Sequence, residues 1–273
     1  MRADQLLQAR GLATSRSQAQ RLIAAGVRWQ PDVANAAAWK PIAKNSDDLP
    51  EDARIELLDA AEARYVSRGG LKLEGALRQS GLSVAGKRCL DVGQSTGGFT
   101  DCLLQHGAAS VVGVDVGHGQ LHPALRSDAR VLCIEGVNAR TLSTTDLVAD
   151  GADQERVRPV FDANFEVIVG DLSFISLTLV LPALVPLLVP QGALLLLVKP
   201  QFELQPGQVG KGGIVRDAAL YTVVEQRLRE SLRSLALPVQ GWFESTIKGG
   251  DGNREFFVYA TKSSATNQAG TPS

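Results

Sequence analysis

The chain has few cysteines and histidines, and neither set has the spacing of a metal site. Its 273 residues include three cysteines, at positions 89, 102 and 133, and no C-x-x-C pair. His118 and His122 are four residues apart, but the glycines on either side of His118 disfavour a regular helix. We therefore expect no metal. An odd number of cysteines in apolar surroundings favours a reduced, cytoplasmic protein.

A strong net charge is also missing. The formal net charge is −1 at pH 7, so the molecule as a whole does not point to a nucleic acid or a membrane as its partner. The first thirty residues are different, because they hold one acid, Asp4, against Arg2, Arg10, Arg16, Arg21 and Arg28. This local excess either solvates short helices or binds RNA phosphates.

No uninterrupted apolar helix is expected. Residues 172–198 contain no charged side chain, but Pro182, Pro186 and Pro190 would repeatedly break a membrane-spanning helix. A buried helix followed by a strand fits this segment better. The first four residues carry charge without an apolar segment behind them, so we expect no secretory signal and a protein that stays inside the cell.

Size and composition predict two domains in a soluble globular chain. Hydrophobic residues make up 44% and charged residues 21%. Near the N-terminus we expect helices over residues 4–9 and 18–25, the second capped by Ser15 or Ser17 and ended by Gly26. Short strands and helices then alternate from about residue 84, which is typical of an α/β fold.

The predicted sheet is open, doubly wound and mostly parallel, with seven strands. The strands cover residues 88–92, 110–114, 131–134, 167–169, 193–198, 239–247 and 255–261. The last two should form an antiparallel hairpin. We expect residues 149–160 to be a surface insertion and residues 263–273 a disordered tail.

A glycine-rich turn after the first of these strands predicts a cofactor site. The turn opens a helix and holds Asp91, Gly93, Ser95, Thr96, Gly97, Gly98 and Phe99. Asp115, at the end of the next strand and followed by Val116, is placed to accept ribose hydroxyls. The alternative is that the glycines only allow tight strand-to-helix packing.

The turn lacks the G-x-G-x-x-G spacing of dinucleotide sites. An acid at the strand end and Ser95 in place of a second glycine suit the free ammonium of S-adenosylmethionine better than a pyrophosphate. Glu135 and Asn138, which follow the third strand, either face the adenine or cap a turn.

Two further ionisable residues end strands of the same sheet. Asp171 and Lys199 should lie at the cofactor edge and form an ion pair, either structural or catalytic. The glycine-rich segment 201–216, which carries Lys211 and Arg216, is either a mobile basic loop that closes over RNA or an ordinary connection.

Several motifs in series resemble the haemolysin-A-type (TlyA-like) ribosomal RNA methyltransferases, whose catalytic half is of the FtsJ type. They lie at residues 67–73, 95–101, 114–117, 171–177 and 210–217. Residues 15–26 resemble the RNA-binding domain named after ribosomal protein S-four. Ala3, where that domain usually has leucine, and residues 27–31 depart from its pattern.

The resemblance implies an S-four-type domain over residues 1–62 and a methyltransferase domain over residues 63–262. It implies an S-adenosylmethionine-dependent enzyme that methylates the ribose 2′-hydroxyl of cytidine in ribosomal RNA of the small subunit, the large subunit or both. The implied catalytic tetrad is Lys72, Asp171, Lys199 and Glu255, and Arg68 joins the expected RNA contacts.

In this tetrad Lys199 is the candidate base. Burial and Lys72 would favour its neutral form, whereas Asp171 and Glu255 would oppose this. The alternatives are a catalytically silent RNA-binding or ribosome-assembly factor, a base methyltransferase, and a membrane-lytic, haemolysin-like protein.

Overall fold

The structure is a computed structural model that describes residues 1–31, 38–58, 63–147, 164–250 and 252–264. The chain divides into two compact units, Met1–Leu71 and Lys72–Ser273. The predicted insertion at residues 149–160, and all but two residues of the predicted tail, lie outside the described residues.

The first unit combines two helices with a small antiparallel sheet. Its elements are α1 (Ala3–Ala9), α2 (Arg16–Gly26), β1 (Val27–Gln30), β2 (Lys40–Pro41) and β3 (Arg54–Leu57), and the strand order is β2-β1-β3. The hydroxyl of Ser15 accepts a hydrogen bond from the backbone N–H of Gln18 at 3.2 Å. Both expected helices, and Ser15 as the cap of the second, are therefore confirmed.

A buried carboxylate organises the arginines of this unit. The side chain of Asp4 is fully buried, and it lies 3.0 Å from both Arg2 Nε and Arg16 Nε. Hydrogen bonds from Arg2 and Arg16 hold the pKa of Asp4 well below its usual range. Two of the arginines counted as a local basic excess therefore pair inside the unit.

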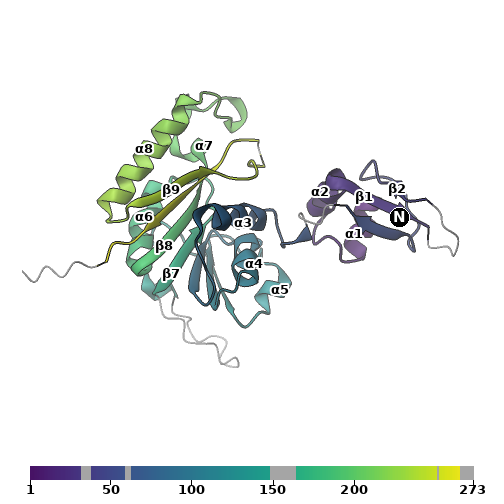
Figure 1. The fold of residues 1–273 in the computed structure, drawn as a ribbon, viewed down its shortest axis with the longest axis horizontal. Coiled ribbons are helices and arrows are strands. Elements are labelled where there is room, and N and C mark those ends of the chain that lie inside the picture. The colour runs from purple at the N-terminus through teal and green to yellow at the C-terminus, as the bar shows by residue number, and fades with distance from the viewer. Residues whose placement is uncertain (32–37, 59–62, 148–163, 251, 265–273) are drawn as a thin grey trace, which may run out of the picture. The chain divides into compact units, whose positions relative to one another are not determined.

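The second unit is built on a seven-stranded sheet (Figure 1). Its strands are β4 (Arg88–Val92), β5 (Ser110–Asp115), β6 (Val131–Glu135), β7 (Phe165–Gly170), β8 (Leu188–Val198), β9 (Val239–Glu244) and β10 (Phe256–Thr261). The order is β6-β5-β4-β7-β8-β10-β9; the first five strands are parallel, and β10 is antiparallel to both of its neighbours. The predicted fold class and the terminal hairpin are confirmed.

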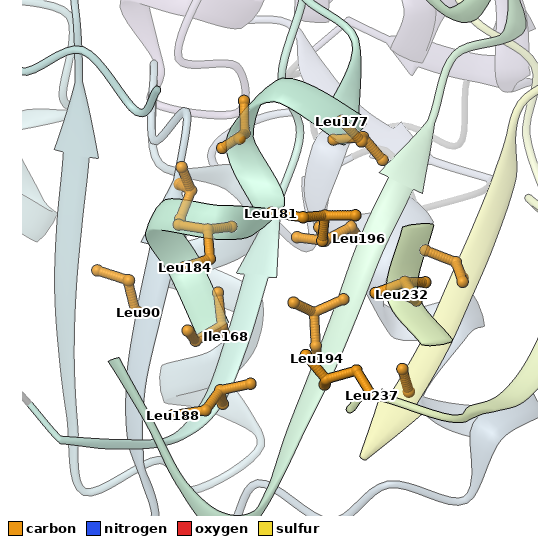
Figure 2. Close-up of a cluster of buried hydrophobic side chains, with 14 of the residues drawn as sticks. Leu90, Ile168, Leu177, Leu181, Leu184, Leu188, Leu194, Leu196, Leu232 and Leu237 are labelled. Atoms are coloured by element: carbon orange, nitrogen blue, oxygen red, sulfur yellow. The ribbon is translucent and has the colours of Figure 1, made fainter. Parts of the chain in front are cut away.

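Helices cover both faces of this sheet. They are α3 (Gly69–Ser80), α4 (Gly98–Gln105), α5 (Pro123–Arg126), α6 (Leu177–Leu184), α7 (Pro200–Glu203) and α8 (Ala219–Ser234). Alternate residues of β8 point to opposite sides, so Leu194 and Leu196 join one core cluster with side chains of α6 and α8. Figure 2 shows these side chains gathered over the strands.

The apolar, proline-containing segment forms a helix and a strand, as expected. Pro182 lies inside α6, Pro186 in a 3₁₀ turn at Val185–Leu187, and Pro190 in β8. Among the described residues, no helix has the length and apolar character needed to cross a membrane.

Replacing Leu181 tests the packing of α6 on the sheet. Its side chain is 1% exposed, whereas Leu179 on the same helix is 47% exposed. Leu181→Ala should lower the free energy of unfolding by about 2–5 kcal/mol, because it leaves a cavity in the core. Leu179→Ala should change it by about 0.5 kcal/mol or less. Urea denaturation measures both, and equal losses would contradict the packing described here.

Candidate active site

A cavity lies where the strand order of the sheet reverses, between β4 and its neighbours β5 and β7. Its volume is about 520 Å³, which is within the range of small-molecule sites. The predicted site residues that line it are Gly93, Ser95, Asp115, Val116, Asn138 and Asp171. The carboxyl ends of adjacent parallel strands thus bring together residues that are far apart in the sequence.

The turn after β4 requires glycine at two positions. Gly93 has φ +83°, and a Cβ atom there would lie 2.9 Å from the carbonyl oxygen of Asp171. Gly97 has φ +92° and caps α4. Ser95 also has a positive φ, of 47°, and its backbone N–H donates to Asp115 Oδ2 at 2.8 Å. The turn therefore brings backbone close to the cavity, as the glycine spacing predicts.

Not every residue of the predicted turn faces the cavity. Gly98 and Phe99 form the buried start of α4, and the Phe99 ring stacks on Phe257 with centroids 6.2 Å apart. Thr96 is exposed, and its carbonyl accepts a hydrogen bond from His122. These residues shape the turn, and their assignment to the cofactor stays a prediction.

Asp91 is fully buried near the carboxyl end of β4, two residues before Gly93, and is not itself part of the cavity lining. Its Oδ2 accepts a hydrogen bond from Thr100 Oγ1 at 2.7 Å, and Thr100 Oγ1 accepts one from Gln94 Nε2 at 2.9 Å. Asp91 Oδ1 and Gln94 Oε1 are also buried, and neither has a hydrogen-bond partner among the residues that the structure describes. Burial, together with the charges of Asp171 and Asp115, raises the pKa of Asp91 to about 7. Such a carboxyl is suited to a cationic or hydrogen-bond-donating ligand.

Asp115 is held in place by backbone donors. Besides the bond from Ser95, its Oδ1 accepts a hydrogen bond from Gly117 N at 2.7 Å. A carboxylate has about four lone-pair sites, so hydroxyl groups of a ligand can still bind. The cavity and Asp115 therefore fit a ligand that carries ribose hydroxyls, and the assignment of Asp91 to an ammonium group stays a prediction.

The two candidates for the adenine side differ. Asn138 lines the cavity, and its Oδ1 also accepts a hydrogen bond from Arg140 N at 3.0 Å. Glu135 is absent from the cavity lining; its Oε1 pairs with Arg126 Nη2 at 2.6 Å and accepts from Gly119 N at 2.8 Å. Both side chains therefore support turns, and their role at the adenine stays a prediction.

Four ionisable residues form two ion pairs. Lys199 Nζ lies 2.6 Å from Asp171 Oδ1, and Lys72 Nζ lies 2.6 Å from Glu255 Oε2. Burial raises the pKa of Glu255. The positive charges of Lys72 and Lys199 lower this pKa, and the negative charge of Asp171 raises it. Glu255 thus interacts electrostatically with the other three. Because Asp171 also lines the cavity, the cluster adjoins it.

Strand register explains how these residues meet. In the antiparallel pairing of β10 with β8, Phe256 lies opposite Val198, so the residues just beyond them, Glu255 and Lys199, come together. Asp171 follows β7, the parallel neighbour of β8. The ion pair between Asp171 and Lys199 is present as expected, and the catalytic assignment of the tetrad stays a prediction.

Sequence reasoning gave no role to three residues around Lys199. Ser173 Oγ accepts a hydrogen bond from Lys199 Nζ at 2.7 Å. Phe174 lines the cavity, is 90% exposed and has φ +64°. Glu203 is buried at the end of α7. Ser173 and Phe174 lie within the motif at residues 171–177, but no spacing rule identifies their contacts.

The predicted RNA-binding residues of the second unit are exposed. Lys211 and Arg216 flank a short segment that Asn253 ties down, since Asn253 Nδ2 donates to Gly213 O and its Oδ1 accepts from Val215 N. In the first unit, Arg10 donates to the carbonyl of Glu51, and Arg21 and Arg68 are partly buried. Their role in RNA binding stays a prediction.

Metal ligands do not cluster in the described part of the chain, where no group of three or more His, Cys, Asp or Glu side chains could hold an ion.

A family model of FtsJ-like methyltransferases matches residues 65–262. The chain belongs to this family. It is 42% identical to the 16S/23S rRNA (cytidine-2′-O)-methyltransferase TlyA of Mycobacterium tuberculosis, over 94% of this chain and 88% of that protein. It is 36% identical to hemolysin A of Brachyspira hyodysenteriae, over 95% of this chain and 99% of that protein.

A solved structure is similar to this chain in both sequence and fold. A candidate hemolysin from Streptococcus thermophilus is 38% identical, with a TM-score of 0.69 over 96% of this chain and 88% of that one. The expected resemblance to TlyA-like methyltransferases with an FtsJ-type catalytic half is confirmed.

Replacing Asp91 tests its buried environment without any ligand. A carboxyl whose pKa is raised in the folded state stabilises the fold fully only at low pH, and this contribution is lost as the pH rises toward about 7. Asp91→Asn should therefore be more stable than the wild type at about pH 8, and near equal to it at about pH 4. Urea denaturation at both pH values measures this, and a pH-independent difference would contradict it.

Proposed function

We propose that this protein is an S-adenosylmethionine-dependent methyltransferase that modifies the ribose 2′-hydroxyl of cytidine in ribosomal RNA. The observation that carries the proposal is the cluster of two lysines and two acids beside the cavity. The names of two relatives support the target: TlyA of Mycobacterium tuberculosis, and the 23S rRNA (cytidine-2′-O)-methyltransferase TlyA of Campylobacter jejuni, which is 33% identical over 80% of this chain.

The cofactor assignment follows from the polar groups at the cavity. Asp115 would accept the ribose hydroxyls, and the unsatisfied oxygen of Asp91 would take the ammonium group. The turn containing Gly93 and Gly97 would place backbone against the amino-acid portion, with Asn138 on the adenine side. When bound, S-adenosylmethionine supplies an electrophilic methyl group on a sulfonium sulfur.

Lys199 would handle the proton of the target hydroxyl. A ribose hydroxyl is a poor nucleophile, and its proton must leave as the oxygen–carbon bond forms and the carbon–sulfur bond breaks. An uncharged Lys199 amine would accept this proton, and Asp171 and Ser173 would fix its direction. Lys72, and Lys199 once it has taken the proton, would stabilise the negative charge that develops on the oxygen. Alignment of the reactants can lower the activation free energy by about 7–11 kcal/mol.

The first unit would dock the enzyme on RNA as an S-four-type domain. Residues 15–26, which carry that resemblance, form α2 and its cap. Pairing of Arg2 and Arg16 with Asp4 leaves both guanidinium groups partly exposed, so phosphates can still reach them. Ribosomal RNA or a ribosomal subunit would then be the partner, in the cytoplasm.

One experiment separates the candidate functions. Purified protein is incubated with labelled S-adenosylmethionine and unmodified ribosomal subunits, and the labelled nucleotide is mapped. Label in an alkali-resistant dinucleotide indicates ribose methylation, whereas label in a free mononucleotide indicates base methylation. Absence of label in all RNA would favour a silent assembly factor. Leakage of liposomes caused by the protein would support the membrane-lytic alternative that the hemolysin A name raises.

Lys199→Ala should reduce turnover by at least about 100-fold, because it removes both the candidate base and a cation beside the alkoxide. Cofactor affinity should stay within about twofold of the wild type, since Lys199 is not part of the cavity lining. The matched control is Lys87→Ala, just before the amino end of β4. Single-turnover methylation and calorimetry measure the two quantities. Unchanged turnover would remove Lys199 from the mechanism.

Replacing both Lys211 and Arg216 by alanine should weaken RNA binding and flatten its dependence on salt. Two lost phosphate contacts should reduce the slope of log K against log salt concentration by about 1.4–1.8. The charge-matched control replaces Lys87 and Arg233, which lie outside the site. Filter binding at several salt concentrations gives the slopes, and equal slopes in the two double variants would indicate an ordinary connecting loop.

A further inference from the structure

Glu203 is a buried carboxylate outside the predicted tetrad. It ends α7, the single helical turn that follows Lys199, and it is 3% exposed. Its Oε2 accepts a hydrogen bond from Ser176 Oγ at 2.6 Å, and its Oε1 accepts one from the backbone N–H of Leu177 at 2.7 Å. Both donors lie at the start of α6, so Glu203 joins α7 to the N-terminus of α6.

The segment between Asp171 and Ser176 is therefore held at both ends by one short stretch of chain. Lys199, just before α7, binds Asp171 and Ser173, while Glu203, at the other end of α7, binds Ser176 and the next backbone N–H. We call residues 171–176 the tethered segment. It supplies several side chains to the cavity wall.

The tethered segment contains a strained residue. Phe174 has φ +64°, a conformation that residues with a side chain adopt rarely and only when their surroundings impose it. Its side chain is 90% exposed, although its ring lies 5.0 Å from that of Phe202, centroid to centroid. Little burial of its own side chain therefore holds Phe174 in place. The packing of Leu172 and Ile175 on the core and the hydrogen bonds at the ends of the segment hold this conformation.

We propose that Glu203 is a positioning residue, which holds the tethered segment in the conformation in which Asp171 and Ser173 orient the amine of Lys199. This inference rests on the proposed function. Glu203 does not contact the reacting atoms; it acts through Ser176 and the first turn of α6.

A glutamine at position 203 separates the hydrogen bonds of Glu203 from its charge. Burial raises the pKa of Glu203. The hydrogen bonds from Ser176 and Leu177 lower this pKa, and so does the positive charge of Arg227. A glutamine can keep both contacts, because its oxygen can accept from Leu177 N and its NH₂ can donate to Ser176 Oγ. The Ser176 hydroxyl can then donate to Thr178 Oγ1, 2.8 Å away.

The test compares Glu203→Ala and Glu203→Gln with a destabilised control. Leu237→Val removes a methylene from a buried side chain near the amino end of β8, away from the cavity. In the methylation assay, Glu203→Ala should lower kcat at least about tenfold with little change in KM for RNA, whereas Glu203→Gln and Leu237→Val should stay within about threefold of the wild type. Ser176→Ala removes one of the two hydrogen bonds to Glu203, and its kcat should lie between those of Glu203→Ala and the wild type.

Amide hydrogen exchange tests the tether without any activity. Glu203→Ala should speed exchange in residues 172–177 at least about tenfold, and Leu237→Val should not. Unchanged exchange there, or a kcat loss in Glu203→Gln as large as in Glu203→Ala, would overturn the role of Glu203. If Glu203→Ala does not fold, the same readouts on Ser176→Ala decide. A wild type with normal exchange and no methylation of RNA would instead overturn the proposed function.

Discussion

The site depends on the pairing of β10 with β8. This antiparallel register places Phe256 opposite Val198, and so brings an acid and a lysine to the same edge of the sheet from positions 56 residues apart. Two ion pairs complete the arrangement: Lys72 pairs with Glu255, and Lys199 pairs with Asp171. Both lysine side chains are largely buried. A shift of the register by one residue would turn Glu255 to the other face of the sheet and leave Lys72 as an uncompensated buried charge.

Most of the fold could be predicted from the sequence because its signals are local. Short apolar strands, glycine at strand-to-helix turns and Ser15 before α2 are each set by neighbouring residues. Strand limits are less accurate: β8 begins at Leu188, five residues before the expected start at residue 193. The parallel neighbour β7 supports the first of the extra residues, since Phe165 pairs with Leu188; the register then shifts, and pairing resumes between Val167 and Ala193.

The site was predictable only in part. Positions at strand ends followed from topology, and the tetrad came from family resemblance. The contacts that hold those positions depend on side-chain geometry between distant segments, which spacing does not encode. Asp4 illustrates this, because it counted as one acid among five arginines, yet it lies buried between two of them. Likewise, nothing in the sequence around Glu203 indicated that it caps α6.

Gly93 and the backbone of Asp171 lie so close together that no Cβ atom fits between them. The glycine turn after β4 and the residue that follows β7 are separated by backbone atoms alone, with no side chain between them to act as an adjustable spacer. Displacement of either segment would therefore be transmitted to the other. With the proposed roles of the turn and of Asp171, affinity for the methyl donor and reactivity toward the acceptor would be mechanically linked and difficult to tune separately.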